Sequence, residues 1–231
     1  MRAIRTSVAG VALLAVLAVT GCAGAGRGAE RVPGPDGAAA AAADLEVLFR
    51  ARQDSARLRY VEADVRFVQG MIAHHAQAIV MAELAPTHGA SGAVRTLAAR
   101  IINAQRDEIA AMEAWLRERG EAVPEVHVLG LEVMAHGAAH AAHDMPGMLT
   151  VEQMRELDRA RGPEFDRLFL TYMIQHHRGA VVMVHDLFAT DGAGQDEAVF
   201  KLASDVQVDQ ATEIARMEQM LSALPAAGGA R

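Results

Sequence analysis

Cysteine is nearly absent from this 231-residue chain, which contains only Cys22. A disulfide within the chain needs a second cysteine, so none can form. Metal sites built from several thiolates are excluded for the same reason. Any metal bound by the folded part of this chain must therefore use other ligands.

Other familiar features are also scarce. Aromatic residues make up 4% of the chain, and no Gly-x-Ser-x-Gly, His-Glu-x-x-His or phosphate-binding glycine loop occurs. With 22 basic and 29 acidic residues the formal net charge is −7, a balance that disfavours nucleic acid and favours cations. We expect small or positively charged partners, and the sequence leaves open whether any reaction is catalysed.

The first 21 residues are predicted to be a secretory signal. They contain no acidic residue, and Arg2 and Arg5 precede an apolar run that is too short to span a membrane as a stable anchor. The run ends in VTGC, which resembles a bacterial lipobox and implies cleavage before Cys22 and lipid attachment to its sulfur. An ordinary signal peptide with an incidental Cys22 is the alternative. Either way the mature chain is expected in the cell envelope, in the periplasm or at the outer face of the cytoplasmic membrane.

Residues 22–60 are expected to form a flexible Gly/Ala/Pro-rich spacer with a lead-in helix. The body, residues 61–224, is rich in alanine, leucine, methionine, glutamate and arginine, and shows no alternating β-branched run between turn signals. An all-α fold is therefore predicted. Its long helices are expected at about 61–85, 92–118, 164–189 and 196–223.

The body contains an internal repeat, with residues 61–118 as the first copy, 119–163 as a long crossover and 164–223 as the second copy. At a shift of 102, Asp64, Phe67, Met71, Ile72, His74, His75, Ala78, Val80 and Met81 recur as Asp166, Phe169, Met173, Ile174, His176, His177, Ala180, Val182 and Met183. At a shift of 105, Gln105, Glu108, Ile109 and Met112 recur as Gln210, Glu213, Ile214 and Met217. A duplicated helical hairpin with a long crossover predicts a pseudo-two-fold four-helix bundle.

The histidine pairs lie on an apolar helix face. At 100° per residue, Met71, His74 and His75 share the face that must pack inward. A lone histidine there would more often be a core residue with a hydrogen-bond partner, but equivalent pairs in two copies favour metal ligation. Protonated imidazole cannot bind a metal, so binding is expected to weaken as the pH falls through the histidine range.

Methionine and glutamate add further candidate ligands. Thioether and imidazole together suit Cu(I), Cu(II) or Ag(I), although methionine can also serve as core filler. Glu108 and Glu213 are candidate outer ligands or groups that orient the histidines, and surface ion pairs are the alternative. The candidate metal residues are Met71, His74, His75, Met81, Met173, His176, His177, Met183, Glu108, Met112, Glu213 and Met217.

The crossover contains a second candidate metal-binding segment. It comprises Met134, His136, His140, His143, Met145 and Met148. If this segment is helical, the three histidines share one face; if it is irregular, they form a flexible cage. A solvated His-rich linker is the alternative.

The two sequence repeats resemble the family of exported bacterial proteins with domain of unknown function 305. The segments DVRFVQGMIAHHAQA and FDRLFLTYMIQHHRGA carry the first part of its signature, and AQRDEIAAM and DQATEIARM carry the second. The resemblance implies a ferritin-like four-helix bundle and a role in copper handling at the cell envelope. Copper buffering, sequestration or resistance is therefore the expected function. A ferritin-like di-metal oxidoreductase and a metal-free structural or partner-binding bundle remain as alternatives, and a homo-oligomer or a copper-exchange partner protein is compatible with the sequence.

Overall fold

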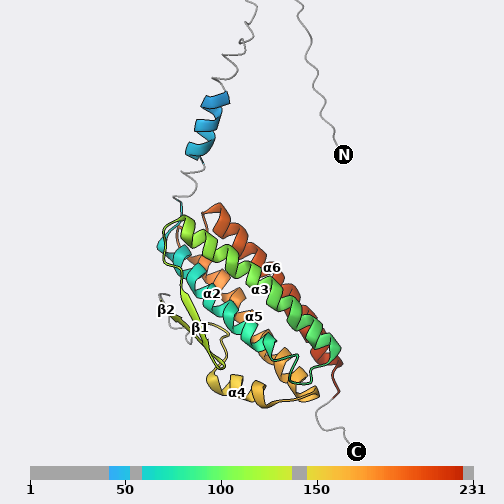
Figure 1. Cartoon of the computed structure of the whole chain (residues 1–231). Helices are drawn as coiled ribbons and strands as arrows, with labels where there is room; N and C mark the ends of the chain where they lie inside the picture. Colours follow the sequence, from blue (N-terminus) through green and yellow to red (C-terminus); the bar gives the residue numbers. More distant parts are fainter. Residues whose placement is uncertain (1–41, 53–58, 137–144, 226–231) are drawn as a thin grey trace, which may run out of the picture. The chain divides into compact units, whose positions relative to one another are not determined.

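The computed structural model describes residues 42–52, 59–136 and 145–225 of the chain (Figure 1). A helix over residues 42–52 is exposed along its whole length. It crosses the boundary between two units of the chain, Met1–Leu45 and Glu46–Arg231, and the second unit holds the other described elements. The predicted signal, Cys22, His140 and His143 lie outside the described residues.

Two helical hairpins form the bundle. The first joins α2 (Glu62–Glu83) to α3 (Gly92–Glu118), and the second joins α5 (Pro163–Ala189) to α6 (Glu197–Ala223). Helix α2 also packs directly on α5, so these two helices form the centre of the bundle. The predicted all-α fold is confirmed, and each long helix lies within two residues of its predicted range.

The helix starts follow local chemistry. Ser91 accepts a hydrogen bond from the Val94 backbone, and Asp196 accepts from Ala198 and Val199, so both residues act as N-caps. Helix α5 begins with Pro163, whose missing N–H would have no helical partner at this position. These local signals are why the helix ends could be read from the sequence.

A repeated aspartate ties each hairpin to the other. Asp64, on the first turn of α2, accepts a hydrogen bond from the Gly194 backbone in the α5–α6 loop at 2.7 Å. Its counterpart Asp166, on α5, accepts from the Ser91 backbone in the α2–α3 loop at 3.1 Å. Both carboxylates are buried. The start of each inner helix is therefore held against the loop of the opposite hairpin.

A buried ion pair joins the end of α3 to the start of α6. The Arg119 guanidinium donates to Asp196 at 2.7 Å and lies 4.4 Å from the centre of the Trp115 ring. The Trp115 indole donates to the other oxygen of Asp196 at 3.0 Å. Since the same carboxylate also caps α6, these bonds fix the two outer helices relative to each other at this end.

The crossover is more structured than the sequence predicted. An antiparallel hairpin forms from β1 (Glu125–Leu129) and β2 (Glu132–His136), followed by α4 (Val151–Arg159). The sequence patterns predicted no strand, and this was wrong. Valine alternates with polar residues at Val126 and Val128 and recurs at Val133, and Gly130, with φ 63°, provides the turn between the two strands. The hairpin and α4 lie on the side of the bundle formed by α2 and α5 (Figure 1).

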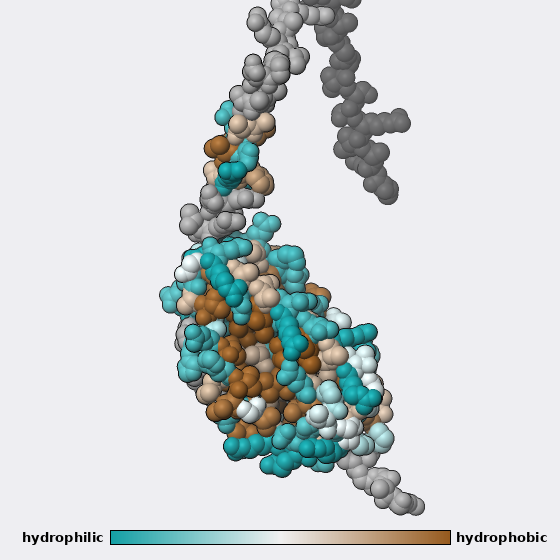
Figure 2. All heavy atoms as spheres, viewed as in Figure 1, coloured by the Kyte–Doolittle hydropathy of each residue, from teal (hydrophilic) through white to brown (hydrophobic). Residues whose placement is uncertain are grey.

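Two apolar clusters make up most of the core, one toward each end of the bundle. On α2, one cluster ends at Ile72 and the other starts at Ala78; on α5, the boundary falls between Ile174 and Ala180. The His-His pairs occupy the gap on both helices. Apolar side chains also reach the surface, and Figure 2 shows them gathered on the face in view between bands of hydrophilic residues. None of the described helices is long and apolar enough to cross a membrane.

Candidate metal centre

Four buried imidazoles meet where α2 and α5 pack together. His74, His75, His176 and His177 are each fully shielded from solvent. The rings of His74 and His176, which occupy equivalent positions in the two repeats, have centroids 3.9 Å apart and planes inclined by 38°. We call these four side chains the imidazole layer. The two halves of the repeat thus meet in one place.

The outer histidines each contact a carboxylate. His75 Nε2 lies 2.7 Å from Glu108 Oε2 on α3, and His177 Nε2 lies 2.6 Å from Glu213 Oε2 on α6. The carboxylates remain partly exposed, with side-chain accessibilities of 16% and 21%. Such a contact fixes the orientation of an imidazole ring and leaves Nδ1 as its second nitrogen.

Several imidazole nitrogens in the layer have no hydrogen-bond partner. His74 Nε2 meets the Pro146 carbonyl at 3.0 Å, but Nδ1 of all four histidines and Nε2 of His176 are buried and unpaired. A buried polar atom without a partner costs about 1–3 kcal/mol. A metal ion bound by these nitrogens would remove that cost, so the residues present fit a metal.

Burial keeps the central pair uncharged. Burial, with a smaller contribution from the nearby His75, lowers the pKa of His74 to about 3. Burial, followed by His74 and His177, also holds the pKa of His176 well below 6.5. Both rings therefore present neutral nitrogen lone pairs at neutral pH, which is the form that binds metals.

The predicted methionines flank the imidazole layer. Met71 and Met112 are fully buried in the apolar cluster on one side. Met81, Met173 and Met217 are fully buried in the cluster on the other side. Since the layer separates the two clusters, thioether groups lie in the apolar packing on both sides of the imidazoles.

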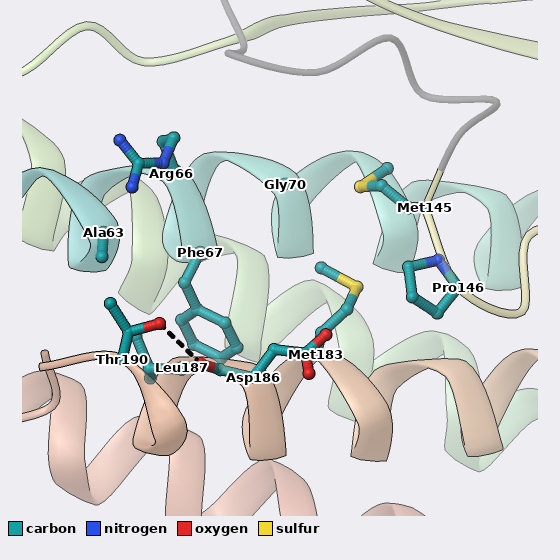
Figure 3. A pocket seen from close by; sticks show the side chains of 10 residues that line it. All are labelled: Ala63, Arg66, Phe67, Gly70, Met145, Pro146, Met183, Asp186, Leu187 and Thr190. Carbon is teal, nitrogen blue, oxygen red and sulfur yellow. Dashed lines mark hydrogen bonds between the residues drawn. The ribbon is translucent and has the colours of Figure 1, made fainter.

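Met183, the counterpart of Met81 in the second repeat, lies beside the crossover. It lies with Met145, from the crossover, in a pocket of about 280 Å³ between α2 and α5 (Figure 3). A Cβ built on Gly70 would lie 3.2 Å from the Met145 sulfur and 3.5 Å from the Met183 methyl group, so the missing side chain at Gly70 makes room for both. The structure thus brings together one residue from each of the two predicted methionine groups.

The four described residues of the predicted crossover site lie in two places. Met145 and Met148 are buried against Ala73 on α2, so they belong to the bundle. His136 ends strand β2 and is exposed, which makes the helical arrangement of His136, His140 and His143 wrong for its first member. Met134 lies half-buried in the same strand. The described members of the predicted crossover site are therefore divided between the core and the hairpin.

A break in the repeat explains why the crossover docks here. Gln77 and Gly179 occupy equivalent positions, and each contacts the crossover differently. Gln77 exchanges two hydrogen bonds with the Leu149 backbone, at 2.8 and 3.1 Å. At Gly179 the crossover backbone comes so close that a Cβ would lie 2.0 Å from the Pro146 carbonyl oxygen. Glycine here lets the Pro146 carbonyl reach His74.

We expect Gly179→Ala to destabilise the protein by about 1–3 kcal/mol, the usual cost of forcing extra volume into a packed core. The added methyl group must push the crossover away from α5 and so weaken the His74–Pro146 contact. Denaturant unfolding measures the loss. Gly92→Ala is the matched control, because a Cβ there meets only the Arg95 guanidinium at 4.0 Å. Equal stability of the two variants would contradict this account of Gly179.

Sequence reasoning identified the histidines but missed their supports. Asp64 and Asp166 were noted as repeated residues without a role, and the Pro146 carbonyl was not considered. The sequence signal for this role was the recurrence of an aspartate near the start of the first helix in each repeat. Within residues 42–52, 59–136 and 145–225, no three His, Cys, Asp or Glu side chains form a ready-made metal cage. An ion in the layer would therefore draw on nitrogen together with sulfur or a carbonyl oxygen, or on small side-chain movements.

Comparison with known proteins places this geometry in context. The family described as Domain of unknown function (DUF305) matches residues 64–221. A DUF305 fragment from Deinococcus radiodurans is 30% identical, with a TM-score of 0.58, and the alignment covers 71% of this chain and 97% of that one. A DUF305 protein from Streptomyces coelicolor is 26% identical, with a TM-score of 0.57 and coverages of 73% and 96%.

A third similar structure is CopM in its Cu(II)-bound form. It is 30% identical to this chain, with a TM-score of 0.53, and the alignment covers 69% of this chain and 95% of CopM. CopM has also been solved in Cu(I)-bound and Ag-bound forms. None of the curated proteins matches the chain.

Proposed function

We propose, from the premise that the chain belongs to the DUF305 family, that it is an exported copper-binding protein whose imidazole layer holds Cu(I), Cu(II) or Ag(I). Its role would be to buffer or sequester the metal, or to confer resistance to it. The observation that carries this proposal is the contact between His74 and His176, two neutral buried imidazoles whose ring centroids lie 3.9 Å apart. Three of their four ring nitrogens have no hydrogen-bond partner.

The ligand chemistry favours soft and borderline metals. Neutral imidazole suits copper in both oxidation states, and thioether suits Cu(I) and Ag(I), whereas magnesium and calcium require oxygen ligands. The similarity to CopM, which binds copper and silver, supports the same choice. We propose His74 and His176 as the central ligands of one shared site.

The other predicted residues take supporting roles in this proposal. His75 and His177 would be further ligands through Nδ1, with Glu108 and Glu213 holding their rings through Nε2. Met71 and Met173, three and four residues before a histidine pair on the same helix, would supply sulfur to Cu(I). Met81, Met112 and Met217 would exclude water from the layer. Met183 and Met145 would offer thioether ligands at the pocket beside the layer.

A ferritin-like di-metal oxidoreductase finds no such support. In those enzymes, carboxylates from several helices converge on two ions. Here the Glu108 and Glu213 carboxylates each contact the Nε2 atom of a histidine in their own hairpin.

Metal selectivity tests the proposal. Protein purified without an affinity tag is exposed separately to copper under reducing conditions, silver, zinc, iron and manganese, and its tightly bound metal is then measured. We expect about one copper or silver ion per chain at high affinity. Manganese should be lost on dialysis because the layer offers no cluster of hard ligands, and zinc and iron should bind more weakly than copper because divalent metals at nitrogen sites follow the order Fe < Zn < Cu. Tight iron with dioxygen-dependent turnover would instead support the oxidoreductase.

Location forms the second part of the proposal. The N-terminal charge pattern and the VTGC sequence support export and lipid attachment at Cys22, which would tether the bundle to the membrane. Cys22→Ala is expected to move most of the protein from the membrane fraction to the soluble or secreted fraction without lowering its melting temperature. Fractionation with immunoblotting measures this shift. Continued attachment of the variant to membranes would show that Cys22 is not the anchor.

A further inference from the structure

The pocket shown in Figure 3 lies beside the imidazole layer. It is formed by α2, α5 and the crossover, and Gly70 belongs to its α2 wall. Gly70 precedes His74 by four residues, so it lies about 6 Å away along the same face of α2, a distance of one helical turn. Pro146 also lines the pocket, and its carbonyl contacts His74 Nε2 at 3.0 Å. One wall of this α2–α5 pocket therefore touches a central imidazole.

Solvent exposure decreases in steps from the mouth of the α2–α5 pocket to the layer. Asp186 is exposed, Met183 is half-buried, Met145 is 9% exposed and His74 is fully shielded. The first three line the pocket, and Pro146, the neighbour of Met145 in the chain, connects the pocket to His74. These residues form a connected series from solvent to the imidazoles.

Two thioether groups meet inside the α2–α5 pocket. The Met145 sulfur and the Met183 methyl group both lie within 3.5 Å of the point that a Cβ on Gly70 would occupy. Met183 also packs against the small cluster that contains Met145. The methionine side chain is flexible, so rotation about its last bonds can turn the Met183 sulfur toward the same space. Two thioethers at one place suit Cu(I) and Ag(I) and suit hard cations poorly.

The imidazole layer needs an entrance for a metal ion, because all four of its side chains are shielded from solvent. Apolar clusters close it on both sides along the bundle. Toward α3 and α6 it is closed by the contacts of His75 with Glu108 at 2.7 Å and of His177 with Glu213 at 2.6 Å. An ion that enters there must separate one of these pairs. On the side of the α2–α5 pocket, an ion meets sulfur ligands first.

We infer that the α2–α5 pocket is the port through which Cu(I) or Ag(I) reaches the imidazole layer, with Met145 and Met183 as its first ligands. This inference rests on the proposed copper function of the layer. A carbonyl can only accept a hydrogen bond, so His74 Nε2 carries the proton and Nδ1 presents a lone pair to the metal. The ion passes from sulfur to neutral nitrogen with no proton released and no change of oxidation state. Pro146, which lies between the pocket and His74, must shift to let it through.

Transfer of Cu(I) from a weak coloured chelator to the tag-free protein, followed by stopped flow, tests the port. The double change Met145→Leu and Met183→Leu should slow transfer at least about tenfold, equivalent to about 1.4 kcal/mol in the barrier, because the incoming ion loses its first ligands. The equilibrium affinity of the layer should change less than about threefold. Met220→Leu is the matched control, since it makes the same change at a half-buried methionine of α6 outside the pocket lining, and it should leave the rate unchanged.

A pair of charge reversals distinguishes the two possible entrances. Asp186→Arg places a positive charge at the mouth of the α2–α5 pocket and should slow Cu(I) transfer at least about threefold at low ionic strength. Asp209→Arg places the same charge between α3 and α6, beside Glu108 and Glu213, and should change the rate less than about twofold. A larger effect of Asp209→Arg than of Asp186→Arg would overturn the port and place the entrance between α3 and α6.

A variant without the central imidazoles separates this inference from the proposed function. In the double variant His74→Leu and His176→Leu, tight Ag(I) binding should be lost, yet Ag(I) should still shift the NMR signals of the isotope-labelled Met145 and Met183 methyl groups. Tight Ag(I) binding retained by this variant would refute the layer as the metal site, and the port with it. The port alone fails if tight binding is lost and neither methionine signal shifts, or if the two leucine substitutions at the methionines leave the transfer rate unchanged.

Discussion

Replacing His176 alone by leucine is expected to abolish the tight copper site and not merely to halve the bound metal. His74 and His176 face each other at 3.9 Å between ring centroids, so removal of either leaves one central imidazole. Loss of a residue that only orients a ligand already costs about 10–100-fold in affinity. Loss of a ligand should therefore weaken Cu(I) binding by at least about 100-fold, as measured by competition with a chelator of known affinity.

The double variants distinguish one shared site from two. If the site is shared, His74→Ala with His75→Ala and His176→Ala with His177→Ala each remove all the tightly bound copper. If each repeat holds its own ion, each pair removes about half. His88→Ala is the control, because His88 is also buried but contacts Thr87 and Asp158 outside the imidazole layer. It should lower stability and leave the stoichiometry unchanged. Full copper binding by the quadruple variant would make the histidines packing residues.

Acidification is expected to destabilise the metal-free protein strongly between pH 7 and pH 5. The pKa of His74 is lowered to about 3 and that of His176 lies well below 6.5, the ordinary histidine value, which both regain on unfolding. Below pH 6.5 the unfolded chain thus binds more protons than the folded one, and stability falls as the pH falls. His74 should contribute about 2 kcal/mol to the loss over this range, and His176 should add to the loss in the same direction.

Denaturant unfolding of the apo protein at pH 7, 6 and 5 measures this dependence. The variant with leucine at both His74 and His176 should lose most of the pH slope, and the His88→Ala control should keep it. If the stability of the leucine variant depends on pH as steeply as that of the unmodified protein, the effect belongs to other groups. The same pKa shifts change an expectation from the sequence. Since the pKa of His74 is about 3 and that of His176 is lowered in the same direction, copper affinity should fall less between pH 7 and pH 5 than it would at histidines with ordinary pKa values.

Helical periodicity predicted those parts of the molecule that depend on local sequence. The four long helices, their ends and the inward face that carries His74 and His75 follow from residues three and four apart. The opposition of His74 and His176 needed the additional fact of the repeat, which implied a pseudo-two-fold arrangement. The identity of the metal ligands remains a prediction from the same pattern.

Contacts made across long distances in the chain could not be predicted in this way. The Pro146 carbonyl reaches His74 from 72 residues away, and nothing in the local pattern around Pro146 indicates this partner. Gly179 stands where the first repeat has Gln77, and nothing in the local sequence indicates that this glycine admits the crossover backbone to the surface of α5. The β-hairpin was missed for another reason. Its alternating valines span few residues, so the strongly helical composition around them dominated the interpretation.

The contacts of the paired aspartates relate the two hairpins in the same way as the subunits of a symmetric dimer. Asp64 and Asp166 each bind the loop of the opposite hairpin, so each hairpin donates to the other the contact that it receives, as in an isologous subunit interface. Two identical chains could build such an interface but would carry the same residue at the positions of Gln77 and Gly179. Fusion of the halves allows these positions to differ, so a single crossover can cover one side of a symmetric pair of imidazoles. Covalent linkage thereby lets one asymmetric segment, the crossover, close one face of a two-fold site, while equivalent carboxylates of the two repeats lie on the opposite face.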